Sequence, residues 1–125
     1  MKVEWNTGLI AYLGIEFVEL TPDRVLARLK VTENLMTVGG TVHGGTLMAF
    51  ADTIGAAGTV ANLAEGQRTA TLESKTNFIA GCRSGTVQAE AKPIHKGKRT
   101  HVWETRITDE AGKLLSVTTQ TQMIL

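Results

Sequence analysis

The chain has 125 residues, of which 42% are hydrophobic and 20% charged, and its formal net charge is +1. This length and composition predict one globular domain over residues 1–125, and they exclude a disordered chain or a coiled coil. The near-neutral charge excludes a general attraction to nucleic acid or to an anionic membrane. Cys82 is the only cysteine, which excludes an intramolecular disulfide and a cysteine-based metal cluster and favours a cytoplasmic protein.

The first predicted elements are two strands that follow a short opening segment. Residues up to Leu13 predict a short helix or irregular chain. Apolar residues then predict strands over residues 15–20 and 25–31, with the sequence Thr-Pro-Asp at residues 21–23 forming the turn between them.

A long helix is the next predicted element, from about Gly45 to Leu63. Asp52 is the only formally charged residue between Asn34 and Ala64. Repeated glycines, Thr46 and Asp52 nevertheless interrupt this stretch, so it lacks the roughly twenty predominantly apolar residues that a membrane span requires. Apolar side chains cover most of the helix circumference, which predicts a buried helix. These residues are Leu47, Met48, Phe50, Ala51, Ile54, Ala57, Val60 and Ala61. Gly55 and Gly58 leave room for the close approach of another segment.

After Gly66 the sequence alternates with a period of two, which predicts four strands. The residues expected to share one face of a strand are Val87, Ala89 and Ala91; then His101, Trp103, Thr105 and Ile107; then Leu115, Val117, Thr119 and Met123. Turn residues between these runs predict antiparallel hairpins. Two strands, one buried helix and four strands predict an α+β fold, in which one antiparallel sheet wraps around the helix.

Candidate functional residues concentrate at the start of the helix and at Asp52, nine residues after His43. The first turn of a helix presents free N–H groups that can hold an oxyanion, and glycines at positions 44 and 45 let a ligand approach them closely. An ionised carboxylate in a buried helix is costly unless it is hydrogen-bonded or functional. Asp52 is therefore a candidate catalytic residue, and a purely structural hydrogen bond is the alternative.

The spacing of Gly44 and Asp52 predicts a dimer. Eight residues correspond to about 12 Å along one helix, too far for both groups to act on one reacting carbon. If both serve one reaction, the acid must come from a second subunit whose helix runs antiparallel beside the first, as a two-fold axis arranges. We therefore expect a homodimer with two shared sites.

These features resemble a known family. The sequence TVHGG at residues 41–45, the acid nine residues after His43, the strand sequence TNFI at residues 76–79 and the hairpin sequence GKR at residues 97–99 resemble hotdog-fold thioesterases of the phenylacetate-degradation and 4-hydroxybenzoyl-CoA type. The resemblance runs from about Asn34 to the C-terminus. It implies a hotdog fold and hydrolysis of an acyl-CoA thioester in a dimer or dimer of dimers. It implies no metal and no cofactor, since coenzyme A is part of the substrate.

The resemblance also implies roles for individual residues. The Gly44 N–H would polarise the thioester carbonyl, and Asp52 of the partner subunit would act as general base or nucleophile. Thr37 stands six residues before His43, where the family often has Asn or Gln, and its hydroxyl can still position water or the carbonyl. Thr71, on the following strand, is a candidate for the helper hydroxyl that some members place where this chain has Ala56.

His43 has two possible roles: general base, or orientation of the helix start through its ring nitrogens. We favour the second because no acid lies close in sequence to complete a triad. Gly45 and Met48 are expected to contact the substrate, with Met36, Leu47 and Phe50 also near the acyl group, and an aromatic acyl group is our preference.

Basic residues on one predicted hairpin are candidates for binding the phosphates of coenzyme A. They are Lys92, His95, Lys96, Lys98 and Arg99, with Arg83 on another loop. Hairpin tips are often basic simply because they are solvated, which is the alternative interpretation.

Two other functions are compatible with the sequence. Hotdog dehydratases and hydratases also use a histidine with an acid, so the fold alone does not determine the reaction. The glycine pair after His43, together with Asp52, favours hydrolysis. A non-catalytic acyl-CoA-binding domain would keep the pocket and the basic hairpin, but it would not need Asp52.

Overall fold

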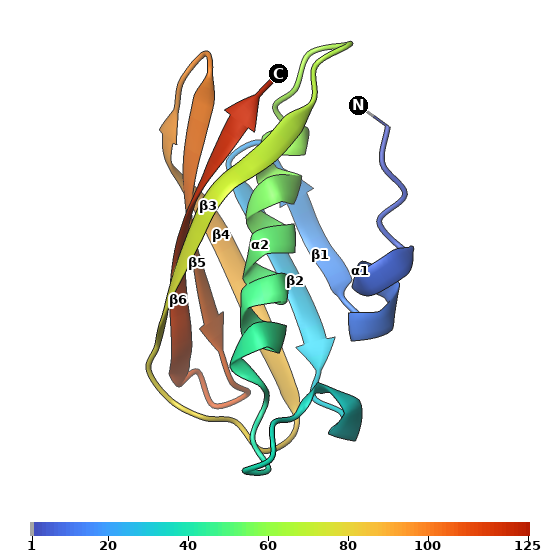
Figure 1. The fold of residues 1–125 in the computed structure, drawn as a ribbon, viewed down its shortest axis with the longest axis vertical. Helices are drawn as coiled ribbons and strands as arrows, with labels where there is room; N and C mark the ends of the chain where they lie inside the picture. Colours follow the sequence, from blue (N-terminus) through green and yellow to red (C-terminus); the bar gives the residue numbers. More distant parts are fainter. Residues whose placement is uncertain (1) are drawn as a thin grey trace.

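The computed structural model describes residues 2–125 and consists of one six-stranded antiparallel sheet around one long helix (Figure 1). The elements in chain order are α1 (Gly8–Leu13), β1 (Glu16–Thr21), β2 (Arg24–Lys30), a 3-10 turn (Glu33–Leu35), α2 (Gly44–Val60), β3 (Thr69–Phe78), β4 (Thr86–Lys96), β5 (Thr100–Thr108) and β6 (Leu114–Ile124). This order confirms the predicted α+β architecture. No helix within residues 2–125 is both long and apolar enough to cross a bilayer.

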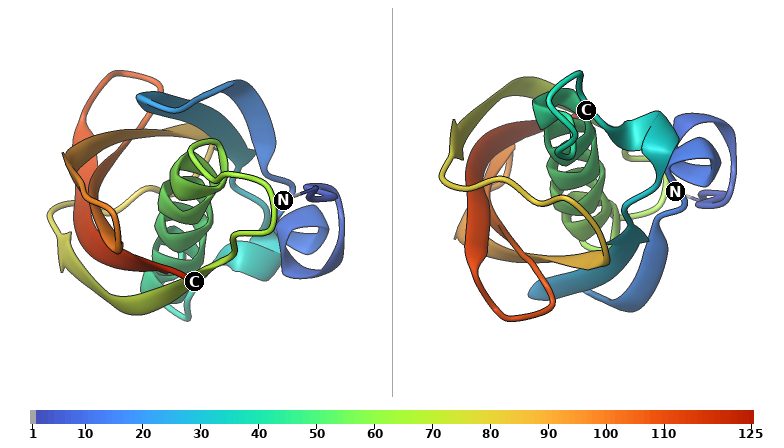
Figure 2. Two further views of the ribbon diagram at one scale, coloured as in Figure 1. Left: turned by 90° about the horizontal axis from the view of Figure 1, so that it is seen from above. Right: turned by 90° about the horizontal axis from the view of Figure 1, so that it is seen from below.

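The sheet has the order β1-β2-β4-β5-β6-β3, so β1 and β3 form its two edges. Each strand runs antiparallel to its neighbours. Seen along α2, the sheet curves around the helix, and α1 lies on the opposite side of α2 from the sheet (Figure 2). The core therefore fills the space between α2 and the concave face of the sheet.

The glycines of α2 allow this close packing. A side chain at Gly58 would collide with the ring of Trp103, the largest fully buried side chain, and one at Gly55 would collide with the amide of Gln120. The close approach expected at both positions is made by side chains and not by another backbone. The helix ends at Val60, three residues before the predicted end, and the chain continues in turns in which Asn62 and Leu63 donate to carbonyls three residues earlier.

One face of α2 corrects the expectation that the helix is buried all round. The sheet surrounds only part of the helix, which leaves a stripe of residues exposed or half-buried. This open stripe consists of Gly45, Met48, Ala49, Asp52, Thr53, Ala56 and Val60. Asp52 is therefore half-buried rather than enclosed in the core.

The predicted faces of β4 and β5 are confirmed, because Val87, Ala89 and Ala91 and the alternating residues from His101 to Ile107 are all buried. The predicted face of β6 is wrong after Leu115. The pairing of β5 with β6 shifts register between Ile107 and Thr108, and Leu115 and Ser116 are both buried. Beyond this irregularity, the side chains that face the helix are Ser116, Thr118, Gln120 and Gln122, while Val117, Thr119 and Met123 are only half-buried.

Candidate active site

The loop before α2 folds back on itself and places Thr37 beside the start of the helix. The N–H of Thr37 donates to the carbonyl of Thr41 at 2.8 Å, and Gly40 closes this turn with a left-handed φ of 78°. The carbonyl of Leu35 accepts from the N–H of His43 at 2.8 Å and from the hydroxyl of Thr46 at 3.0 Å. These bonds anchor the loop to the first turn of α2.

His43 caps α2. Its backbone is extended, and its Nδ1 accepts a hydrogen bond from the N–H of Gly45 at 2.7 Å. Nδ1 is therefore unprotonated in this arrangement, and the neutral ring carries its proton on Nε2. This geometry fits the orienting role of His43. It also occupies the Gly45 N–H, so that this group is not offered to a ligand.

The Gly44 N–H is the donor that remains available at the helix start. No acceptor within residues 2–125 forms a hydrogen bond with it. Gly44 lines a groove of about 370 Å³, together with Thr37, Thr41, Val42, Leu47, Phe78, Ile79, Ala80 and Gly81. The Phe78 ring lies against Gly44, so that an added Cβ would be 3.1 Å from two ring carbons. The backbone amide is thus accessible beside an aromatic surface.

Asp52 lies in a second groove, on the open stripe of α2. This groove is lined by Met48, Ala49, Asp52, Thr71 and Ser74. Oδ1 of Asp52 accepts from the Thr71 hydroxyl at 3.0 Å and from Nε2 of Gln120 at 3.1 Å. Oδ2 makes no hydrogen bond to the part of the chain that the structure describes. The structure therefore places Thr71 beside the candidate acid.

Gln120 is the residue of this site that sequence analysis missed. Its side chain is fully buried and faces α2 from β6. The signal was the alternation of polar residues at positions 116, 118, 120 and 122. The predicted face of Leu115, Val117, Thr119 and Met123 excludes these positions.

A single chain brings the predicted residues together in two separate pairs. Thr37 and Gly44 share one groove, whereas Asp52 and Thr71 share the other. The two grooves are eight residues apart along α2, which corresponds to about 12 Å. One chain does not place the Gly44 N–H and the Asp52 carboxylate around a common point.

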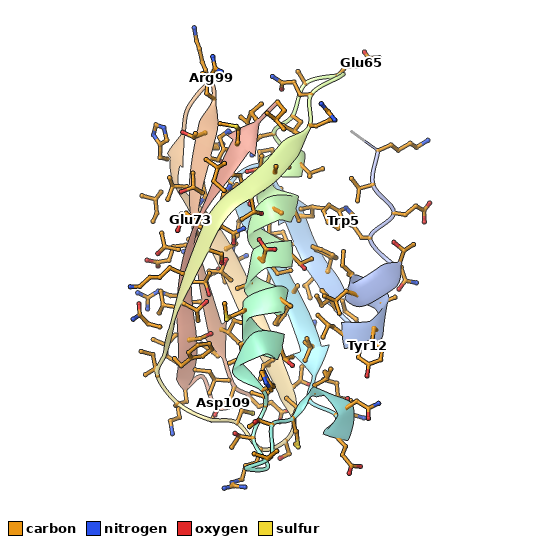
Figure 3. All side chains as sticks on the ribbon, in the orientation of Figure 1. Trp5, Tyr12, Glu65, Glu73, Arg99 and Asp109 are labelled. Atoms are coloured by element: carbon orange, nitrogen blue, oxygen red, sulfur yellow. The ribbon has the colours of Figure 1, made fainter. Side chains whose placement is uncertain are left out.

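The predicted phosphate-binding residues lie at opposite ends of the molecule. Arg83 is at the Gly44 end, where its Nη1 would be 3.2 Å from a Cβ added at Gly40. The hairpin that joins β4 to β5 carries Lys98 and Arg99 and lies beyond the C-terminal end of α2, as the label of Arg99 shows (Figure 3).

Lys96 is already engaged within its own chain. Its Nζ forms an ion pair with Asp23 at 2.6 Å and donates to the side-chain oxygen of Asn62 at 3.2 Å and the carbonyl of Pro22 at 3.3 Å. These contacts join the β1–β2 turn to the chain after α2. Lys96 therefore has a structural role, whereas Lys98 and Arg99 are exposed and form no ion pair within residues 2–125.

Other surface features lie apart from these grooves. A larger hollow of about 460 Å³ on the sheet, between Arg28 and Glu110, contains none of the predicted site residues. Cys82 is buried, and its thiol donates to the carbonyl of Ser84 at 3.2 Å. Within residues 2–125, no three His, Cys, Asp or Glu side chains gather in a group suited to a metal ion.

Comparison with known proteins identifies the family. The thioesterase superfamily model matches residues 39–116. The 1,4-dihydroxy-2-naphthoyl-CoA hydrolase of Listeria monocytogenes is 36% identical over 110 residues, which cover 88% of this chain and 89% of that protein. The hydrolase of the same name from Escherichia coli is 32% identical over 119 residues, which cover 94% of this chain and 87% of that protein.

Solved structures agree with this assignment. A thioesterase from Haemophilus influenzae superposes with a TM-score of 0.89 at 33% identity, covering 94% of this chain and 82% of that one. Its fold, like the arrangement of one sheet around α2 described above, is the hotdog fold that the motif at residues 41–45 predicted. The chain belongs to the thioesterase superfamily, and it is a hotdog-fold thioester hydrolase.

Proposed function

We propose that the protein hydrolyses an aromatic acyl-CoA in active sites shared between two copies of the chain. The observation that carries this proposal is the Gly44 N–H, a donor without a partner in the described chain that opens into a groove at the start of α2. The positive end of a helix dipole favours the negative charge that develops on a thioester carbonyl oxygen during hydrolysis. One such preorganised donor contributes about 3 kcal/mol to the stabilisation of a transition state.

Asp52 supplies the second part of the proposed reaction. It takes a proton from a water molecule as the water oxygen attacks the carbonyl carbon, and the negative charge moves to the carbonyl oxygen. The tetrahedral intermediate then collapses, the carbon–sulfur bond breaks, and the coenzyme A sulfur receives the proton from Asp52. Attack by Asp52 itself, through an anhydride that water then cleaves, uses the same carboxylate.

A two-fold dimer brings the two pairs of residues into one site. The edge strand β3 exposes its backbone and Leu72, and the open stripe of α2 lies on the uncovered side of the helix. Pairing of two β3 edges would cover both and would place the helices antiparallel to each other. Gly44 of one chain would then approach Asp52 of the partner subunit.

The same arrangement accounts for the separated basic residues. In one chain, the hairpin with Lys98 and Arg99 lies at the end opposite to Gly44. An antiparallel partner reverses these ends, so its hairpin would lie near Gly44 and Arg83 of the first chain. Positive charge from both chains would then surround the phosphates of coenzyme A. Because the net charge of the protein is only +1, a local group of basic residues has to supply the attraction for these phosphates.

Phe78 supports an aromatic acyl group. Its side chain is 53% exposed and lies against the Gly44 backbone, beside the position proposed for the carbonyl. An aromatic acyl group can pack against this ring with a geometry that a flexible alkyl chain does not reproduce. The Listeria and Escherichia relatives are named for a naphthoyl-CoA, which is an aromatic thioester.

The test is release of free coenzyme A, followed with a thiol reagent, from benzoyl-CoA, naphthoyl-CoA and straight-chain acyl-CoAs. We expect the wild type to release coenzyme A fastest from the aromatic thioesters, and Asp52→Asn to lose this activity while still binding the substrate. Binding without release in the wild type would contradict the proposal and favour an acyl-CoA-binding domain. A change in the acyl group with the thioester intact would indicate a hydratase or dehydratase.

A further inference from the structure

Gln120 contacts the candidate catalytic acid from the core side of α2. We propose that Gln120 is a positioning residue that holds Oδ1 of Asp52, so that Oδ2 is the oxygen that reacts. This inference rests on the proposed function, in which Asp52 is the base or the nucleophile. It adds a residue on β6 that neither the TVHGG segment nor the acid itself indicates.

The contacts of Gln120 define its role. The side chain is fully buried, and its Nε2 lies 3.1 Å from Oδ1 of Asp52, 3.2 Å from the Asp52 carbonyl oxygen and 2.9 Å from Oε1 of Gln122. Oδ2 of Asp52 has no hydrogen-bond partner within residues 2–125 and belongs to a residue that lines the open groove. One carboxylate oxygen is thus fixed, and the other is free to meet water or a substrate.

The orientation of the Gln120 amide follows from its neighbours. A reversed amide would place Oε1 against three acceptor oxygens, which repel it, so the NH₂ group must point toward Asp52. Oε1 consequently faces Gly55, where it is buried and has no donor. A buried carbonyl without a partner is unfavourable for stability and calls for an explanation. The donor function of the NH₂ group provides one.

Gln120 differs from Thr71, the other donor to Asp52. The Thr71 hydroxyl has one hydrogen but lies within reach of two acceptors, Oδ1 of Asp52 at 3.0 Å and Oε1 of Gln122 at 2.6 Å. It can therefore turn away from Asp52. Gln120 offers two hydrogens in a fixed plane, and Gln122, which is itself held by Thr69 at 3.0 Å, keeps that plane in place. With one hydrogen directed to Gln122, the other stays directed at Asp52, where Oδ1 and the carbonyl oxygen share it.

The central test is Gln120→Met, which keeps the length of the side chain and removes the amide. We expect kcat for release of coenzyme A to fall about 10- to 100-fold, because a misplaced catalytic group loses its alignment with the reacting atoms. We expect KM to stay within about twofold, because uniform substrate binding does not depend on a buried group that lines neither groove. A merely structural role would not produce this split between kcat and KM.

Gly55→Ala tests the same contact without changing Gln120. The new methyl group would collide with the Gln120 amide, and the flexible end of that side chain must move away from its present position. Alanine is a better helix former than glycine, so the helix itself is not weakened. We expect kcat to fall in the same direction as in Gln120→Met, again with KM nearly unchanged.

Thr118→Val is the matched control. Thr118 is buried on β6 two residues before Gln120, and its hydroxyl pairs across to Thr76 at 2.7 Å. The variant loses a partly buried hydrogen bond on the same strand, and Thr118 makes no hydrogen bond to Asp52. We expect a lower thermal midpoint with kcat within twofold of the wild type.

Two results would overturn the inference while leaving the proposed function intact. The first is an active wild type whose kcat is unchanged within twofold in both Gln120→Met and Gly55→Ala. The second is a loss of kcat in Thr118→Val as large as that in Gln120→Met, which would make the effect one of general packing. Absence of coenzyme A release from the wild type would instead overturn the proposed function, and this inference with it.

Discussion

At the scale of single residues, His43 caps the helix that carries the candidate site. Its Nδ1 accepts the Gly45 N–H at 2.7 Å, while the preceding N–H, that of Gly44, has no partner within residues 2–125 and belongs to a residue that lines the groove. A cap of this kind contributes about 1 kcal/mol to helix stability. It also fixes the direction of the first turn, on which the proposed carbonyl contact depends.

We predict that His43→Asn retains most of the activity, whereas His43→Ala loses about 1 kcal/mol of stability together with part of kcat. Asparagine is among the best capping residues, and its side-chain oxygen can accept the same N–H, while alanine cannot. Urea denaturation and initial rates measured on both variants test this. If His43→Asn were as inactive as Asp52→Asn, His43 would be a general base and the capping role would be insufficient.

Gly44 permits a direct test of the proposed oxyanion donor. Proline has no N–H and is well tolerated at the first position of a helix, and the His43 ψ of 136° suits a residue that precedes proline. We predict that Gly44→Pro lowers kcat about 100-fold, the cost of one lost oxyanion donor.

Gly44→Ala is the control, because it adds a Cβ beside Phe78 but keeps the N–H. We expect it to retain much more activity than Gly44→Pro. Equal losses in the two variants would show that the contact with Phe78, and not the N–H, determines the rate.

At the scale of elements, the periodicity of the sequence was sufficient to predict the order of the helix and strands, but not to predict which face of β6 is buried. The charge-poor, glycine-containing stretch predicted the ends of α2 to within a few residues. A buried helix requires apolar residues, and its close contacts require small ones. On β6 the same reasoning failed at Leu115, since one irregular residue reverses every later side chain and a bulge carries no clear signal in a single sequence. This irregularity is why the predicted site does not include Gln120.

Helix α2 is also joined to β5 by a buried polar group. The indole N–H of Trp103 donates to the Thr59 hydroxyl at 2.9 Å, and that hydroxyl lies 3.0 Å from Nδ1 of His101. His101 Nδ1 is the one acceptor within residues 2–125 that the hydroxyl hydrogen can reach, so this hydrogen is satisfied when Nδ1 is unprotonated. Burial of the ring, followed by the nearby charges of Lys96 and His95, lowers the pKa of His101 below its usual value.

This arrangement predicts acid sensitivity. The unfolded chain binds a proton at His101 more readily than the folded chain, so the free energy of unfolding is highest above about pH 6.5 and decreases as the pH falls toward the lowered pKa. In His101→Gln, whose side chain can still accept the Thr59 hydrogen, we expect a smaller decrease between about pH 7 and pH 5. Urea denaturation at several pH values measures both slopes. Identical slopes would assign the acid sensitivity to other groups.

At the scale of the whole molecule, the sequence predicted that Gly44 and Asp52 lie apart on one helix, but not where the basic residues lie relative to them. The motif at residues 41–45 and the acid nine residues on were readable because they are local in sequence. Their separation into two grooves follows from the straight path of α2 between them. The basic hairpin was predicted from its charged residues and from the resemblance of the GKR sequence. Neither shows that Lys96 forms an ion pair with Asp23, nor that Lys98 and Arg99 lie at the end of the molecule opposite to Gly44.

The sharing of sites between subunits can be tested by mixing two inactive variants. Gly44→Pro lacks the donor, and Asp52→Asn lacks the carboxylate. If each site takes Gly44 from one chain and Asp52 from the other, a mixed dimer contains one site with both defects and one intact site. Random exchange makes half of the dimers mixed, so about a quarter of the wild-type activity should return.

The alternative gives a different result in the same experiment. If each site drew both groups from one chain, every chain in the mixture would carry one defect and no activity would return after subunit exchange. Each variant mixed with itself controls for the exchange procedure, and size-exclusion chromatography confirms that mixed dimers form. Helix geometry fixes the separation of Gly44 and Asp52 along α2 at about 12 Å. A site that uses both groups must therefore take them from two chains, and we expect activity to return in the mixture.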